Sequence, residues 1–273
     1  MTSRLSWVAT ILERRDCIKI LRSIAFMTEF VINVAGNVVA VHAFFESSRE
    51  YCIDYLCDEK PDFSITITEQ DLAFERIKNA GSGSEEDVKV RIVPDAQLEI
   101  TAIQRKLAEE LLGHDVLLFH GSAVAVDGAA YLFTAKSGTG KSTHTRFWRE
   151  MLGNRAVMVN DDKPFLRVTS EDISVGGSPW NGKHRLGSNI NVPMKAICIL
   201  ERGTENKIER VTAEKALPML LQQSNRPVNA AMLPKYMELL DAIASRVDFY
   251  RLQCKAEVEA AALSFNAMAQ GEW

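Results

Sequence analysis

The residues best suited to chemistry form one short run near the middle of the chain, Ala135-Lys136-Ser137-Gly138-Thr139-Gly140-Lys141-Ser142. The apolar stretch 129–134 precedes this run, and residues 143–151 after it have the pattern of an amphipathic helix. A strand, a glycine-rich loop and a helix in this order are what a phosphate-binding loop requires. The sequence therefore predicts a nucleotide phosphate site here.

The residue types in this run match the needs of that site. Glycines at 138 and 140 allow backbone N–H groups to turn toward phosphate oxygens, and Lys141 adds a mobile positive charge. The Ser142 hydroxyl can ligate a magnesium ion that bridges the outer phosphates. Ala135 stands where the usual pattern begins with glycine, so the opening turn must accept a Cβ. The expected nucleotide contacts in and after the run are Ser137, Gly138, Thr139, Gly140, Lys141, Ser142 and Thr143.

Two further segments could complete a phosphoryl-transfer site. A short apolar strand, residues 156–159, ends in Asn160-Asp161-Asp162, and phosphoryl transfer needs a metal-binding or base carboxylate near the γ-phosphate. The glycine-rich stretch 176–187 contains Lys183 and Arg185, which could stabilise transferring phosphates. The alternatives are a solvated acidic turn for the first segment and an ordinary long connection for the second.

Composition excludes several classes of protein. A chain of 273 residues with 47% apolar residues is long enough for one large domain and one small one. A net charge of -4 without clustered Lys and Arg argues against a nucleic-acid partner. The five cysteines, at 17, 52, 57, 198 and 254, follow no metal-ligand spacing and indicate reduced thiols in a cytoplasmic protein.

The N-terminal region predicts neither a secretion signal nor a membrane span. Residues 1–15 lack a long apolar core and a cleavage site. The most apolar window, 24–45, is interrupted by Glu29, Asn33 and His42 and by a Gly36-Asn37 turn signal, which favours two strands joined by a hairpin. We therefore expect no membrane partner.

The rest of the chain predicts a mixed α/β architecture in two parts. Residues 1–95 are expected to form a mainly β N-terminal domain, with a further strand at 63–68 and a helix at 69–79 capped by Thr68. Residues 96–273 are expected to form the catalytic domain. Its predicted helices are 96–112, 143–151, 213–223, 234–245 and 257–269, and its predicted strands are 116–120, 123–126, 129–134, 156–159, 165–168, 173–175, 195–200, 207–211 and 249–253. Asp127-Gly128 makes the approach to the glycine loop an antiparallel hairpin, and a second hairpin is expected around residues 201–206.

With these pieces placed, residues 120–200 resemble the HPr kinase/phosphorylase family, which shares a nucleotide-binding core with the phosphoenolpyruvate carboxykinases. The matching residues are His120-Gly121, the run from Ser137 to Ser142, and Val159-Asn160-Asp161-Asp162. The resemblance implies a carboxykinase-type P-loop core in the α/β class, with a mixed sheet. It also implies that Asp162 accepts the hydroxyl proton, that His120 and Lys141 act in catalysis, and that Ser142 ligates the metal. We expect Asp161 to hold the metal with Ser142.

The sequence departs from the family at its usual Arg-Gly-x-Gly signature, where Gly-Ser-Pro-Trp-Asn-Gly-Lys stands instead. This stretch and residues 250–254 are more similar to stand-alone HPr-kinase-like proteins encoded with peptide-modification cassettes. The sequence thus predicts an ATP- and Mg²⁺-dependent kinase acting on a hydroxyl of a peptide, a protein serine or a small molecule. A homo-oligomer would match family relatives, which form hexamers. The alternatives are a non-catalytic nucleotide-binding switch or adaptor and, less favoured, a carboxykinase.

Overall fold

The structure, a computed structural model, describes residues 28–80 and 93–269. The expectations for residues 1–15 and for Cys17 lie outside this part of the chain. The described residues divide into two compact units. The first reaches Ile32 and continues from Val38 to Ile103, and the second contains Asn33–Asn37 and the residues from Gln104 onward. The predicted domain boundary at residue 95 falls at the start of helix α4 (Asp95–Leu112), the helix that contains the division.

The first unit is a small α+β structure. Its three-stranded sheet has the order β1 (Thr28–Val34), β2 (Asn37–Ala43) and β3 (Phe63–Thr66), and β2 and β3 are parallel. The turn between β1 and β2 uses Ala35 and Gly36 with φ values of 50° and 73°, one residue earlier than predicted. Helix α3 (Glu69–Ala80) begins after Thr68, whose Oγ1 accepts the Asp71 N–H at 3.3 Å, which confirms the predicted cap. Helix α2 (Glu46–Tyr51) and the 3₁₀ turn Ile53–Tyr55 were not predicted.

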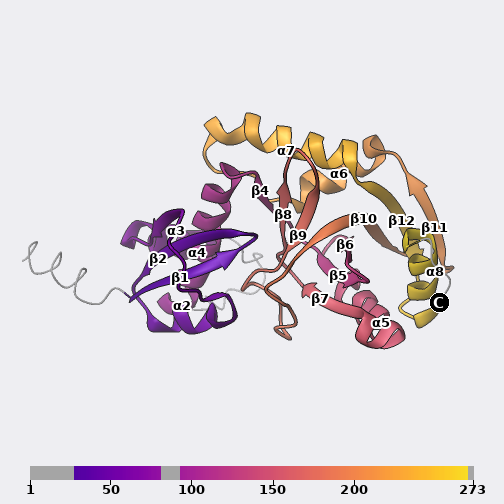
Figure 1. The fold of residues 1–273 in the computed structure, drawn as a ribbon, viewed down its shortest axis with the longest axis horizontal. Coiled ribbons are helices and arrows are strands. Elements are labelled where there is room, and N and C mark those ends of the chain that lie inside the picture. The colour runs from indigo at the N-terminus through magenta and orange to yellow at the C-terminus, as the bar shows by residue number, and fades with distance from the viewer. Residues whose placement is uncertain (1–27, 81–92, 270–273) are drawn as a thin grey trace, which may run out of the picture. The chain divides into compact units, whose positions relative to one another are not determined.

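The second unit contains a nine-stranded mixed sheet (Figure 1). Its continuous order is β4 (Val116–Leu118), β8 (Phe165–Val168), β9 (Ile173–Gly176), β10 (Asn191–Arg202), β6 (Ala129–Thr134), β5 (Ser122–Val126) and β7 (Ala156–Asn160). Strand β12 (Asp248–Cys254) pairs with β10, and β11 (Lys207–Val211) pairs with β12. The long β10 pairs antiparallel with β9 through its first three residues, and parallel with β6 from Met194 and with β12 from Ala196. The sheet therefore changes partner and direction along a single strand, and it curls there.

Of the two hairpins predicted in this unit, one is confirmed and the other is wrong. Strands β5 and β6 are antiparallel and turn at Asp127 and Gly128, whose φ values are 52° and 84°, so the predicted antiparallel approach to the glycine loop is confirmed. The hairpin expected around residues 201–206 is wrong, because β12 lies between β10 and β11. A local turn signal does not reveal that a strand from the end of the chain inserts between its two arms.

Helices cover both faces of the sheet, and strand periodicity explains why. Along β5, Ala123 and Ala125 join one apolar cluster while Val124 and Val126 join the other, because successive side chains point to opposite faces. The first cluster includes buried residues of α6 (Ala213–Gln223) and α7 (Leu233–Arg246). The second includes residues of α5 (Lys141–Leu152) and α8 (Val258–Ala269) (Figure 1). Three layers result, and the glycine loop leads into α5.

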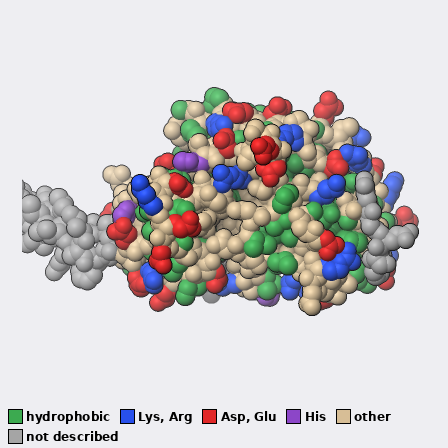
Figure 2. Space-filling model, viewed as in Figure 1, with side chains coloured by type: hydrophobic (Ala, Val, Ile, Leu, Met, Phe, Trp, Pro, Cys, Tyr) green, Lys and Arg blue, Asp and Glu red, His purple; other side chains and the backbone are tan. Residues whose placement is uncertain are grey.

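The surface carries acidic and basic side chains interspersed with apolar ones on the face shown in Figure 2. No helix within residues 28–80 and 93–269 has the length and hydropathy needed to cross a bilayer. No disulfide joins the four cysteines of the described residues, Cys52, Cys57, Cys198 and Cys254.

The aromatic cluster beneath α5 generates a stability prediction. Trp148 is fully buried and packs against the rings of Tyr131, Phe133 and Phe265 at centroid distances of 5.1 to 5.3 Å. We expect Trp148→Ala to lower the free energy of unfolding by about 3–5 kcal/mol, because the cavity it leaves cannot collapse fully. Denaturant unfolding followed by far-UV circular dichroism measures this change. Met237→Ala, at an exposed position of α7, is the control and should stay within about 0.5 kcal/mol. A loss below about 1 kcal/mol in the Trp148 variant would contradict the packing described.

Candidate functional site

The glycine loop, residues 135–140, connects β6 to α5 in a conformation that requires its glycines. Gly138 and Gly140 have φ values of 75° and 116°, while the space where a Cβ would lie is open at both positions. Backbone conformation rather than crowding therefore selects glycine. The loop folds back on itself through Thr139, whose N–H and Oγ1 both donate to the Lys136 carbonyl, at 3.3 and 2.8 Å. Helix α5 then begins at Lys141, and its first amides lack intrahelical partners, as at every helix start.

Lys141 lies largely buried at the start of α5. Its Nζ donates to the Ala135 carbonyl at 3.3 Å, across the mouth of the loop. Burial lowers the pKa of this ammonium, and the charges of Asp162 and Asp161 partly oppose that shift. The lysine is therefore within electrostatic reach of both predicted carboxylates.

Asn160 holds the turn that presents those carboxylates. Its side chain is fully buried at the end of β7. The Oδ1 atom accepts the backbone N–H groups of Asp162 and Lys163 at 2.9 and 2.7 Å, and Nδ2 donates to the Ser178 carbonyl at 3.0 Å. One amide side chain thus ties the acidic turn to the stretch 176–187.

The two aspartates have different surroundings. Asp161 is 9% exposed, and its Oδ1 accepts the Ser122 hydroxyl at 2.6 Å. Burial raises the pKa of Asp161, while hydrogen bonds from the Ser122 and Ser142 hydroxyls act against that rise. The Asp162 side chain is 39% exposed, and its pKa is also raised by burial, opposed by Lys163 and Lys141. One carboxylate is therefore enclosed among hydroxyls and the other opens toward solvent.

His120 faces Asp162 at the meeting point of several elements. Its Nε2 lies 3.4 Å from Asp162 Oδ1. Its backbone N–H donates to the Gln223 carbonyl at 2.7 Å, and its backbone carbonyl accepts the Thr134 hydroxyl at 3.0 Å. Burial and the charges of Lys163 and Lys141 lower the pKa of His120 to about 4, and the Gln223 side chain acts in the opposite direction. Asp162 at 3.4 Å would favour the charged ring, but burial and two lysines outweigh one partly solvated carboxylate.

The structure thus brings together His120, Lys141, Ser142, Asp161 and Asp162. The two remaining predicted cations lie elsewhere on the stretch 176–187. This stretch passes close to the acidic turn, since a Cβ on Gly182 would meet the Asp161 carbonyl at 3.3 Å. Lys183 is exposed, and Arg185, also exposed, lines a cavity beside β7 together with Met158. The phosphate contacts of Lys183 and Arg185 stay predictions.

Four residues of the site were missed by sequence reasoning. Lys163 directly follows the acidic pair and could have been noticed there, whereas Ser122 and His184 have no local signal. Arg202, at the end of β10, donates from Nη2 to the Gly138 carbonyl at 2.6 Å and fastens the glycine loop from the outside. Only tertiary structure places Ser122, His184 and Arg202 beside the loop and the aspartates.

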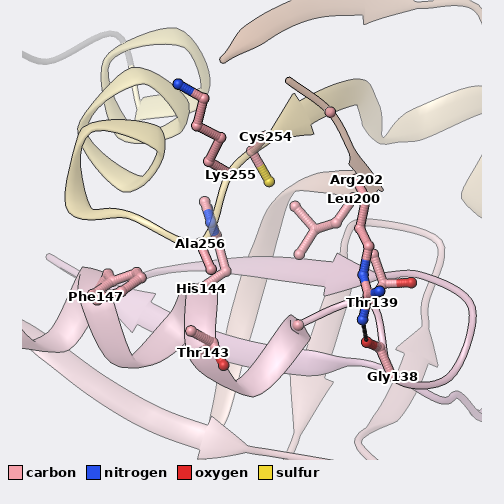
Figure 3. Close-up of a pocket in the computed structure, with 12 residues that line it drawn as sticks. Gly138, Thr139, Thr143, His144, Phe147, Leu200, Arg202, Cys254, Lys255 and Ala256 are labelled. Carbon is pink, nitrogen blue, oxygen red and sulfur yellow. Dashed lines mark hydrogen bonds between the residues drawn. The ribbon is translucent and has the colours of Figure 1, made fainter. Parts of the chain in front are cut away.

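Two cavities flank the glycine loop and the start of α5. The first has a volume of about 410 Å³ and lies between the loop, α5 and the ends of β10 and β12 (Figure 3). The second, of about 760 Å³, is lined by Ser142, Asp161 and His184 among others. The described residues contain no cluster of three or more His, Cys, Asp or Glu side chains that could hold a metal. Asp161 and Ser142 nevertheless suit Mg²⁺, which usually takes one or two protein ligands and completes its shell with phosphate and water.

Comparisons with known proteins add little to this geometry. No protein-family profile and no curated protein matches the chain. One solved structure that matches is the Hpr(Ser) kinase/phosphatase from Coxiella burnetii, at 12% sequence identity and a TM-score of 0.27. The alignment covers 45% of this chain and 93% of that one. A similarity at this level settles neither fold nor activity, so the function has to be inferred from the site.

The surroundings of His120 generate a pH prediction. We expect its imidazole to remain neutral down to a pH of about 4, with the midpoint read from its ring resonances in an NMR titration. The unfolded chain takes up this proton near pH 6.5 and the native chain does not, so the free energy of unfolding should fall as the pH is lowered from 6.5 to about 4. In the His120→Gln variant, the free energy of unfolding should fall less steeply over this pH range. The ring resonances that disappear in its spectrum identify those of His120. A midpoint near 6.5 would show that the ring is not held out of water.

Proposed function

We propose that this protein is an ATP- and Mg²⁺-dependent phosphotransferase that moves the γ-phosphoryl group to a hydroxyl of a peptide, a protein serine or a small molecule. The observation that carries the proposal is the placement of Lys141 and Ser142, at the start of α5, beside the carboxylates of Asp161 and Asp162. A positive charge, a hydroxyl and two carboxylates around a glycine loop are the groups that phosphoryl transfer uses for positioning and charge stabilisation.

Each group has a proposed role. The amides of the glycine loop and the Lys141 ammonium bind the β- and γ-phosphates. Ser142 and Asp161 hold Mg²⁺, which neutralises charge on the phosphates. The hydrogen bond from Ser122 orients the Asp161 carboxylate, as outer-shell partners do for metal ligands. Burial favours the protonated form of Asp161, and a bound Mg²⁺ would compete with that proton.

Asp162 is proposed to accept the proton of the acceptor hydroxyl. Its carboxylate is partly exposed, so an acceptor can reach it, and its raised pKa makes it a better base than an ordinary aspartate. His120, whose ring is neutral and lies 3.4 Å away, is proposed to orient this carboxylate and to share the proton that Asp162 accepts. The resemblance of residues 120–200 to the HPr kinase/phosphorylase and carboxykinase core supports the same roles, and we propose that the second unit has this type of core.

We also propose a cellular location, a class of partner and an oligomeric state. Free thiols and the absence of a basic cluster in the sequence favour a cytoplasmic enzyme that acts without nucleic acid or membrane. A homo-oligomer is proposed by analogy with the hexameric family relatives alone. A non-catalytic nucleotide switch would use the same glycine loop but would not need Asp162.

Asp162→Asn separates transfer from binding. We expect the variant to keep ATP affinity within about threefold and to lose about 10²–10⁴-fold in transfer rate, because the amide cannot take the proton. Affinity is measured by calorimetry and transfer by a one-phosphate mass shift on peptides and metabolites of a matched lysate. Asp241→Asn, an exposed position of α7, controls for the change of charge. Equal transfer by the Asp162 variant and the wild type would refute the assigned base.

Ser142→Ala tests the metal. We expect Mg²⁺ to strengthen ATP binding to the wild type and this gain to shrink by about tenfold in the variant, because one inner ligand is lost. Calorimetric titrations with and without Mg²⁺ measure the gain directly. Ser245→Ala, exposed on α7, should behave as wild type. If the gain is unchanged in the Ser142 variant, the ion is held by other groups.

A further inference from the structure

The 410 Å³ cavity beside the glycine loop has the size and lining of a small-molecule site. Gly138, Thr139 and Leu200 lie at one end of its lining, and Phe147 lies at the other (Figure 3). The carboxylates of the acidic turn do not border it, because Asp161 lines the second cavity instead. A ligand whose phosphates lie on the loop amides would therefore extend its other end into the first cavity.

His144 is the most constrained polar group in this lining. It is 4% exposed, and its Nε2 lies 2.9 Å from the Ser264 hydroxyl. That hydroxyl donates its single hydrogen to the Ala261 carbonyl at 2.9 Å and accepts the Trp148 indole N–H at 2.8 Å. With the serine hydrogen assigned to the Ala261 carbonyl, Nε2 of His144 is the donor in their contact.

This hydrogen bond determines what the other ring nitrogen can do. A neutral imidazole with its proton on Nε2 carries an acceptor lone pair on Nδ1. The ring is buried, and burial disfavours its charged form. The Phe133 ring packs on it at a centroid distance of 4.7 Å and holds its orientation. Within the described residues, Nδ1 has no hydrogen-bond partner, and the ring borders the cavity.

We propose that this cavity binds the nucleoside end of the nucleotide and that His144 selects adenine over guanine. This inference rests on the proposed function and specifies its nucleotide. The 6-position of adenine carries an amino donor, whereas guanine carries an acceptor oxygen there. With the ring proton held on Nε2, Nδ1 of His144 can accept a hydrogen bond from the 6-amino group of adenine. The same lone pair repels the 6-oxygen of guanine. The partly buried ring of Phe147, one turn after Thr143, offers a face on which a base can stack.

Nucleotide analogues test the proposal on the unmodified protein. Calorimetric titration with Mg²⁺ compares ATP with GTP and with inosine triphosphate, whose base has a keto oxygen in place of the 6-amino group and a proton on N1. We expect ATP to bind at least about tenfold more tightly than either. Equal affinities, or a preference for the keto bases, would overturn the assignment of His144.

A matched pair of variants identifies the residue responsible. His144→Phe keeps an aromatic ring against Phe133 and removes the acceptor, and the ratio of ATP to inosine triphosphate affinity should fall to within about twofold of unity. Ser245→Ala, at an exposed position of α7 outside the cavity lining, should keep the wild-type ratio. An unchanged ratio in the His144 variant overturns the inference.

The two proposals fail in different ways. If no nucleoside triphosphate binds the wild type, the phosphotransferase proposal fails and this inference fails with it. If ATP binds and transfer depends on Asp162, but the base edge makes no difference to affinity, only the role of His144 is refuted. Because the readout is equilibrium binding, it does not depend on knowing the acceptor.

Discussion

The partial burial of opposite charges at the end of β7 is the constraint around which the second unit is built. Removing an ammonium or a carboxylate from water costs several kcal/mol unless an opposite charge and hydrogen bonds replace the solvent. Lys141 and Lys163 supply the positive charges and Asp161 and Asp162 the negative ones. Asn160 maintains this arrangement, since it binds two amides of the acidic turn and anchors them to Ser178. Burial raises the pKa of both aspartates, and the serine hydroxyls and the lysines offset only part of that rise.

The two-faced sheet explains how these charges meet. Strand β5 is paired with β6 on one side and β7 on the other, so the glycine loop after β6 and the acidic turn after β7 emerge near each other. Helix α5 must then cover the sheet through its apolar side, where Trp148 packs against Phe133 and Phe265. The same burial that anchors the helix also immobilises His144. Packing energy therefore positions both the first turn of α5 and the ring that borders the neighbouring cavity.

Much of the local structure was predictable because it depends on short-range rules. Glycine at 138 and 140 reflects positive φ values, Asp127-Gly128 makes a tight turn, and Thr68 caps a helix. Other features depend on partners far away in the sequence. The hairpin predicted between β10 and β11 does not form, because β12 lies between them. Strand β10 extends beyond its predicted ends because β9 pairs with its first residues and β12 with its last. Lys183 and Arg185 have charges suited to phosphate, but their exposed positions depend on how the long stretch folds.

By itself, the sequence determined the order of strand, glycine loop and helix, the acidic pair after the next strand, and therefore the class of chemistry to look for. Periodicity and turn preference act over a few residues, so they can be read without a fold. Only the tertiary structure decided that Ser122, His184 and Arg202 join this site and that Ser264 fixes the ring of His144. Such contacts join residues up to 120 positions apart, and they form because burial of a shared core brings distant segments together.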